Sequence, residues 1–255
     1  MGLELERTIN LFTRLLVNSS TRLFVYSSTR LLDFVAPRMC VMCGKRLSTG
    51  EEYVCGVCQL HIPRTFFHLK PLDNIMAQMF WGQMPIERAT AMFLYQPQSN
   101  TSKIVYNLKY SHKPEIGIVM GRMMANEVMA SGFFEGIDLI IPVPLAPNRM
   151  KQRGYNQSAM LAQGISEISG IELNSHIVIR KGFKESQTRL SRHSRMENVN
   201  EQFVLATDGG SLTDKHILIV DDVATTGATV IACAAAFKGI EGIRFSVMTL
   251  TFTHS

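Results

Sequence analysis

The hydrophobic positions of this chain fall into short apolar runs separated by longer segments with helical spacing. Short apolar runs bounded by Pro, Gly or charged residues predict β-strands, and apolar residues that recur every three or four positions predict helices. The predicted strands cover residues 89–95, 139–143, 177–180, 217–220 and 245–251. The predicted helices cover residues 74–80, 101–110, 116–131, 157–169 and 230–238. Because strands alternate with helices, the pattern predicts an α/β fold with a mainly parallel sheet covered on both faces.

Residues 1–36 also have helical spacing, and Pro37 is expected to end that helix. The helix would pack on the core or on a partner, or else lie on a membrane surface. Its apolar runs are too short and interrupted for the roughly 18 residues of a membrane span, and no export-signal pattern is visible. We therefore expect no transmembrane segment and a cytoplasmic location. The candidate apolar face consists of Leu11, Phe12, Leu15, Leu16, Leu23 and Phe24.

The chain has 255 residues, of which 46% are hydrophobic and 18% charged, as in an ordinary globular protein. This length suffices for one α/β domain and small additions. The predicted organisation is an N-terminal helical extension (1–36), a four-cysteine ribbon (37–62) and an α/β domain (63–255).

Four of the five cysteines form a C-x2-C-x11-C-x2-C pattern at Cys40, Cys43, Cys55 and Cys58. Each short gap lets two sulfur atoms face one point, and four thiolates around zinc form a closed structural site. Two disulfides are the alternative, but the expected compartment and the odd fifth cysteine, Cys233, favour the metal. The pattern therefore predicts a structural zinc ribbon.

The most informative segment covers residues 217–229, where an apolar strand is followed by Asp221, Asp222 and a loop rich in Thr and Gly. Unpaired backbone N–H groups at a helix N-terminus bind phosphate, and threonine hydroxyls add donors. Two carboxylates just beyond a strand's carboxyl end can accept hydrogen bonds from two ribose hydroxyls. The segment therefore predicts a site for a phosphorylated sugar.

Residues 217–229 have two alternative interpretations, one purely structural and one as part of an ATPase site. A strand can end in Asp and a helix can begin at Thr for structural reasons alone, but this explains neither the doubled acid nor the whole Thr-rich string. An ATPase is also conceivable, yet the chain lacks a Gly-x-x-x-x-Gly-Lys-Ser/Thr loop.

Three prolines in six residues, Pro142, Pro144 and Pro147, stand at the end of the strand at 139–143 and in the second loop, which then contains Arg149 and Arg153. A stiff backbone with guanidinium forks suits a diphosphate, whereas the structural alternative is a Pro-capped loop with solvated arginines.

A third segment, 180–199, is polar, Ser-rich and basic, as in a mobile surface loop or a lid over bound ligand. Residues 149–195 hold nine Lys or Arg against three Glu, a net charge of +6, which suits a polyanionic ligand.

Residues 221–229, Asp-Asp-Val-Ala-Thr-Thr-Gly-Ala-Thr, resemble the motif that binds 5-phosphoribosyl-1-pyrophosphate (PRPP) in type I phosphoribosyltransferases. The wider series of motifs closely resembles the ComF family, bacterial phosphoribosyltransferase-like proteins linked to competence and uptake of transforming DNA. The resemblance covers about residues 31–252. Besides the cysteine ribbon and the acidic loop, it is carried by Leu-Lys-Tyr (108–110), Arg-Gly-Tyr-Asn-Gln (153–157), Gln-Thr-x-Leu-Ser (187–191) and Arg-x-x-Asn (195–198).

The resemblance implies a type I phosphoribosyltransferase-like domain that binds PRPP with Mg²⁺. Asp221 and Asp222 become the catalytic candidates and hold the ribose hydroxyls, while Arg149 and Arg153 bind the diphosphate. A transferase of this class would displace pyrophosphate at ribose C1, with an acceptor that the sequence does not indicate. The residues implied to wrap the 5′-phosphate are Thr225, Thr226, Gly227, Ala228 and Thr229, and those implied to close over the ligand are Lys184, Arg189 and Arg195.

The alternative hypothesis is a non-catalytic competence protein of the DNA-uptake machinery. Single-stranded DNA would then follow the basic stretch 149–195, with Tyr155 or Phe183 stacking on bases. The two hypotheses are compatible, because the phosphates of PRPP and of DNA could compete for one site.

Overall fold

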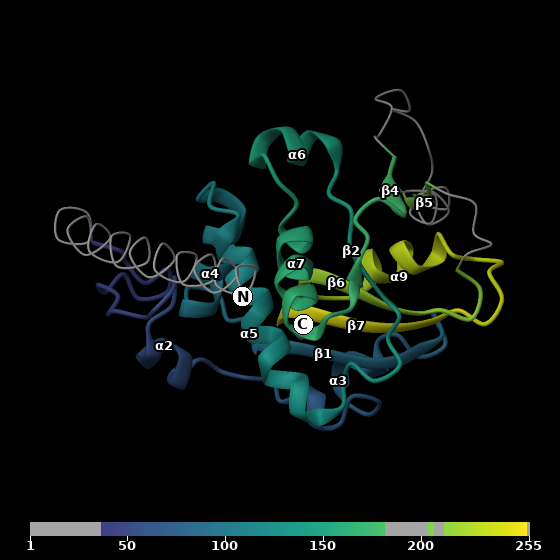
Figure 1. Ribbon diagram of the computed structural model, residues 1–255, viewed down its shortest axis with the longest axis horizontal. Helices are drawn as coiled ribbons and strands as arrows, with labels where there is room; N and C mark the ends of the chain where they lie inside the picture. The colour runs from purple at the N-terminus through teal and green to yellow at the C-terminus, as the bar shows by residue number, and fades with distance from the viewer. Residues whose placement is uncertain (1–36, 182–202, 207–211, 254–255) are drawn as a thin grey trace, which may run out of the picture. The chain divides into compact units, whose positions relative to one another are not determined.

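The computed structural model describes residues 37–181, 203–206 and 212–253 (Figure 1). The predicted N-terminal helix at 1–36 and the predicted loop residues Lys184, Arg189 and Arg195 lie outside these ranges. The chain divides into two compact units, Met1–Cys55 and Gly56–Ser255. The predicted domain boundaries after residues 36 and 62 stay predictions.

The described part of the first unit, residues 37–55, is built from turns and one isolated antiparallel bridge between Met39 and Arg46. The N–H of Val41 donates to the carbonyl of Tyr53 at 2.8 Å, which brings the two ends of this segment together. A turn closes at Gly44, whose positive φ of 70° is a backbone conformation that glycine adopts readily. Met42, Leu47 and Val54 are buried within this segment and add apolar packing to its backbone hydrogen bonds.

The second unit is organised by a five-stranded sheet in which every pair of neighbours is parallel. The strands lie in the order β1-β7-β6-β2-β3, so β6 is the central strand and β7 lies beside it. The predicted α/β class with a mainly parallel sheet is confirmed. The strands are β1 (Ile86–Leu94), β2 (Leu139–Pro142), β3 (Glu172–Leu173), β6 (His216–Ala224) and β7 (Arg244–Phe252).

Helices cover both faces of this sheet (Figure 1). On one face α3 (Ile75–Gln78) and α9 (Ala228–Ala235) share a hydrophobic core with the sheet. On the other face lie α4 (Asn100–Tyr110), α5 (Glu115–Val128) and α7 (Gln157–Ser169), and α7 packs on β2 and β6. Ile217 and Ile219 belong to the first core, so the alternate residues Leu218 and Val220 point to the second. Both faces of β6 are therefore buried, which explains its uninterrupted apolar run.

Helices α5 and α7 approach each other closely because glycines line their contact. A Cβ atom at Gly121 would lie 2.1 Å from the carbonyl oxygen of Leu161, and one at Gly164 would lie 2.0 Å from that of Ile118. No other residue fits at either position without moving the helix axes apart. This packing fixes α7, whose first turn reaches the end of β6.

Several elements differ from the sequence-based predictions. The predicted strand at 177–180 is β4 (Val178–Arg180), but it pairs antiparallel with the unpredicted β5 (Phe203–Leu205) in a separate two-stranded sheet. The predicted proline-stiffened loop contains helix α6 (Pro147–Arg153), because Pro147 occupies the first turn and Gly154, with φ of 80°, ends it. The remaining short elements are α2 (Gly56–His61), η1 (Phe67–Leu69) and η2 (Met129–Ser131).

In the described ranges, no helix has the combination of length and apolar character that crossing a lipid bilayer requires.

Candidate functional site

Strand β6 continues beyond the end of its neighbour β2. Strand β2 ends at Pro142, opposite Val220, whereas β6 runs on beside β7 as far as Ala224. The sequence-based prediction placed Asp221 and Asp222 just after the end of the strand. In the structure they lie inside β6, because β7 continues to pair with β6 at these positions. They still stand at the carboxyl edge of the sheet, where open α/β sheets bind ligands.

Asp221 is a buried carboxylate with hydrogen bonds that hold its position. Its Oδ1 atom accepts from the hydroxyl of Ser158 at 2.8 Å and from the backbone N–H of Asp222 at 2.8 Å. Burial raises the pKa of Asp221 to about 7, and the negative charge of Asp222 adds to the rise. The charged form of a carboxylate this strongly desolvated is stabilised by any ligand that donates hydrogen bonds or positive charge to it.

Asp222 is paired with Lys109 from the last turn of α4. The Nζ atom of Lys109 lies 2.9 Å from Oδ2 of Asp222, and both side chains are largely buried, with 22% and 15% of their surfaces exposed. Sequence reasoning assigned no role to Lys109 or to Ser158. A signal existed for Lys109, which is the middle residue of the Leu-Lys-Tyr motif at 108–110.

The Thr-rich loop joins β6 to α9 and exposes its donors. Thr225, Thr226, Ala228 and Thr229 are exposed, whereas Gly227 is buried. Gly227 has a φ of 72°, and a Cβ there would lie 2.8 Å from the ring of Phe80, so glycine is required on two grounds. The first backbone N–H groups of α9 have no partner within the helix and face the same end of the sheet as the acids.

The two predicted diphosphate arginines differ in their surroundings. Arg149 is exposed on α6, while Arg153 at its end is only 8% exposed. The Nη1 atom of Arg153 donates to Oε1 of Gln157 at 2.8 Å, and its Cζ lies 5.4 Å from the ring centroid of Tyr110. Its buried Nε has no hydrogen-bond partner among the described residues. The contacts with Gln157 and Tyr110 therefore orient Arg153, and its buried Nε remains available as a donor.

Residues that follow Arg153 connect α6 and α7 to the rest of the site. The hydroxyl of Tyr155 donates to the carbonyl of Leu108 at 2.7 Å. Asn156 donates to the carbonyl of Val143 at 2.9 Å, and its Oδ1 accepts from the N–H of Ser158 at 3.1 Å as the N-cap of α7. The motif at 108–110, the motif at 153–157 with the adjacent Ser158, and the acids at 221–222 thus form one contact network.

A third arginine, Arg180 on β4, belongs to the same electrostatic environment. Its guanidinium lies 5.2 Å from the ring centroid of Phe203. Burial lowers the pKa of Arg180, the positive charge of Arg149 lowers it further, and the negative charge of Asp221 opposes both. Arg180 therefore lies within the electrostatic influence of both Arg149 and Asp221, a role that its place in the basic stretch did not predict.

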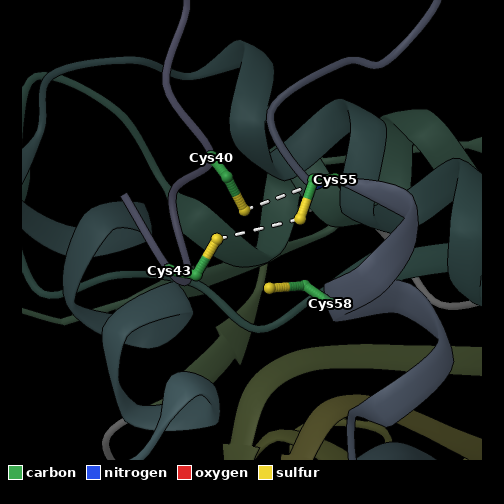
Figure 2. A group of neighbouring side chains, drawn as sticks. All are labelled: Cys40, Cys43, Cys55 and Cys58. Carbon is green, nitrogen blue, oxygen red and sulfur yellow. Dashed lines mark hydrogen bonds between the residues drawn. The ribbon is translucent and has the colours of Figure 1, made fainter. Parts of the chain in front are cut away.

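The four predicted metal ligands come together in space (Figure 2). The sulfur atoms of Cys40, Cys43, Cys55 and Cys58 lie within 4.8 Å of one another, and none forms a disulfide. Burial alone would raise the pKa of the Cys40 thiol, but backbone hydrogen bonds, the largest from Cys43 and Cys55, outweigh it and lower the pKa to about 7. This favours the thiolate that a metal requires. The geometry is typical of a closed four-thiolate metal site.

The fifth cysteine, Cys233, is fully buried on α9. Burial raises the pKa of its thiol, as expected for a small core residue.

These features define an α/β protein with a parallel sheet, an acidic strand end beside a Thr-rich loop, and a four-cysteine cluster. No protein-family model matches the sequence. Among curated proteins, the DNA utilization protein YhgH of Shigella flexneri is 31% identical over 209 residues, covering 76% of this chain and 88% of that protein. Competence protein F of Haemophilus influenzae is 28% identical over 214 residues, covering 80% and 81%.

Among solved structures, a hypoxanthine phosphoribosyltransferase from Staphylococcus aureus matches with 16% identity and a TM-score of 0.32. That match covers 54% of this chain and 64% of the other, just under two thirds of its length. The sequence matches to the DNA utilization and competence proteins are the stronger finding. The chain belongs to their family, the ComF family.

Proposed function

We propose that the end of β6 binds PRPP together with Mg²⁺. The observation that carries this proposal is the pairing of two acids on the strand with exposed threonines and helix-start amides in the loop that follows. Asp221 and Asp222 would accept hydrogen bonds from the ribose hydroxyls. The 5′-phosphate would take the donors of Thr225, Thr226, Gly227, Ala228 and Thr229.

The diphosphate of PRPP would lie toward the arginines. Arg149 is exposed and can turn toward a ligand, whereas Arg153 offers the unused Nε of a fixed guanidinium. Arg180 adds a third positive charge, which interacts electrostatically with Asp221. The positive charge of Arg149 acts unfavourably on Arg180, and a bound diphosphate would offset that repulsion.

Magnesium would neutralise part of the negative charge of the diphosphate. The residues fit such an ion, because carboxylate oxygens of the kind offered by Asp222 are the ligands that Mg²⁺ prefers. Lys109 holds a positive charge at 2.9 Å from Asp222 and keeps that carboxylate oriented when no ligand is bound. If transfer takes place, this site would act by positioning the sugar and stabilising the departing diphosphate.

We also propose that the four cysteines bind zinc as a structural ion. Four thiolates leave no open position for water, so the ion would hold the chain together and take no part in a reaction.

The names of the relatives support a role in DNA utilization or competence. We propose that this protein acts in DNA uptake on the cytoplasmic side. Single-stranded DNA binding along residues 149–195 stays a prediction, since residues 182–202 lie outside the described ranges.

A thermal-shift series tests the sugar-phosphate proposal. PRPP with Mg²⁺ should raise the melting temperature more than ribose 5-phosphate or pyrophosphate alone. Only PRPP would contact both the proposed sugar-phosphate residues and the proposed diphosphate arginines. The shift should disappear in Asp222→Asn and persist in Asp73→Asn, which alters an exposed acid elsewhere in the unit. Equal shifts with PRPP in the two variants would refute the proposal.

A further inference from the structure

Lys109 contacts Asp222 with an ammonium group at the end of a flexible side chain. Its Nζ atom lies 2.9 Å from Oδ2 of Asp222, and 22% of the lysine side chain remains exposed to solvent. A lysine carries a point charge on a stem of four carbons, whereas arginine would hold a carboxylate with a rigid fork. The contact at Asp222 is therefore of a kind that opens by rotation of one side chain.

The backbone on both sides of this ion pair is held in place. Strand β7 pairs with β6 along this stretch, and the carbonyl of Asp222 accepts from the hydroxyl of Thr251 at 3.3 Å. In α4, the carbonyl of Leu108 accepts from the hydroxyl of Tyr155 at 2.7 Å. Because strand and helix are both fixed by these bonds, the side chain of Lys109 is the part of the pair that can move.

The positive charge of Lys109 balances two neighbouring carboxylates. It is paired with Asp222 and also acts electrostatically on Asp221. Two carboxylates side by side at a partly buried strand end repel each other unless a cation lies close to them. Ribose hydroxyls carry no charge, so a ligand that takes Asp222 away from Lys109 has to bring a cation of its own.

We propose that Lys109 is an internal cation that holds Asp222 while the site is empty and that competes with a divalent cation for this carboxylate. The inference rests on the proposed binding of PRPP with Mg²⁺ at the end of β6. Lys109 has to release Oδ2 of Asp222 before that oxygen can bind a metal ion or a ribose hydroxyl, and it then turns toward solvent. The free energy of breaking the ion pair is therefore lost from the affinity for the metal alone.

Binding of Mn²⁺ alone to the full chain tests this competition, because Mn²⁺ prefers the same oxygen ligands as Mg²⁺. Electron paramagnetic resonance of the free ion measures the affinity. Lys109→Gln should bind Mn²⁺ about 5- to 150-fold more tightly than wild type, the usual range for coupled binding. Adding Asp222→Asn should abolish the gain, and Lys109→Arg, which keeps the charge, should show none. The matched control is Lys103→Gln, which removes an exposed lysine from the same helix and should bind Mn²⁺ as wild type does.

Acetylation of lysine side chains, read by mass spectrometry, shows whether the pair opens when the sugar binds. A protonated amine in an ion pair reacts poorly with an acylating reagent, and a released amine reacts faster. PRPP with Mg²⁺ should therefore raise the acetylation of Lys109 and leave that of Lys103 unchanged.

The contrary results are distinct from failure of the sugar site. Equal Mn²⁺ affinity in wild type and folded Lys109→Gln would overturn the inference, and Lys109→Met provides a second uncharged variant for the same comparison. Acetylation of Lys109 that does not rise while calorimetry reports bound PRPP would also overturn it. If the sugar proposal alone is wrong, wild type gives no PRPP heat, yet Lys109→Gln still gains affinity for Mn²⁺.

Discussion

Lys109 and Asp222 form an ion pair of 2.9 Å that joins the last turn of α4 to the end of β6. The two residues are far apart in the sequence, and both side chains are largely buried. The pair therefore links the proposed sugar site, at Asp222, to the last turn of α4.

We expect this pair to couple more strongly than an exposed one. A double-mutant cycle with Lys109→Met and Asp222→Asn should give a coupling energy of about 0.5–3 kcal/mol in chemical denaturation, because each single variant leaves a buried group without its partner. The matched control is Arg122 with Glu167, at 2.7 Å and with 42% and 37% of the side chains exposed, where solvent screening should keep the coupling below about 1 kcal/mol. Equal coupling in the two cycles would contradict the burial argument.

Asp221→Asn should stabilise the protein more at pH 8 than at pH 5. The folded-state pKa of Asp221 is raised from 3.8 to about 7, so the folded protein holds this proton across that window while the unfolded chain releases it. The contribution of Asp221 to stability therefore falls as the pH rises from about 4 to 7. Asn keeps an oxygen for Ser158 and carries no charge. Melting temperatures of both proteins across this pH range provide the measurement, and a constant difference would count against the raised pKa.

Gly227→Ala should destabilise the protein more than Gly239→Ala does. Both glycines have positive φ, 72° and 92°, so both substitutions strain the backbone. Only at Gly227 would the new Cβ meet another residue, the ring of Phe80 at 2.8 Å, and this overlap should add about 1–3 kcal/mol. Urea denaturation of the two variants measures the difference in stability. Equal losses of stability would show that the ring of Phe80 moves aside at no cost.

Zinc content should depend on each of the four clustered cysteines. We expect about one zinc ion per chain by elemental analysis, and almost none in Cys40→Ser or Cys58→Ser, because three thiolates hold the ion less firmly. Cys233→Ser should retain the full content, since Cys233 is buried on α9 away from the cluster. Undiminished zinc in Cys40→Ser would contradict the proposed ligand set.

Local patterns were enough to predict the class of fold. The alternation of buried strands and amphipathic helices indicated the parallel sheet, and the spacing of the cysteines indicated the cluster that Figure 2 shows. The sequence-based predictions of secondary structure were wrong where contacts between distant segments determine the local structure. Strand β5 is three residues long and exists because β4 pairs with it, and helix α6 forms although Pro147 suggested a loop.

The candidate site was predicted only in part, because sequence motifs name residues and not their partners. The acids and the Thr-rich loop were recognisable as one continuous segment. Ser158 lies 63 positions from Asp221, and no local signal connects them. Arg153 was expected to face a diphosphate, and its guanidinium is held by Gln157 and Tyr110 with the buried Nε left without a hydrogen-bond partner among the described residues.

Isothermal titration calorimetry of PRPP, with and without Mg²⁺, tests the central claim most directly. We predict saturable, magnesium-dependent heat for the wild-type chain, strongly reduced heat for Asp222→Asn, and unchanged heat for Asp73→Asn. Absence of any saturable heat in the folded wild-type protein with Mg²⁺ present would contradict the claim that the end of β6 binds a phosphorylated pentose.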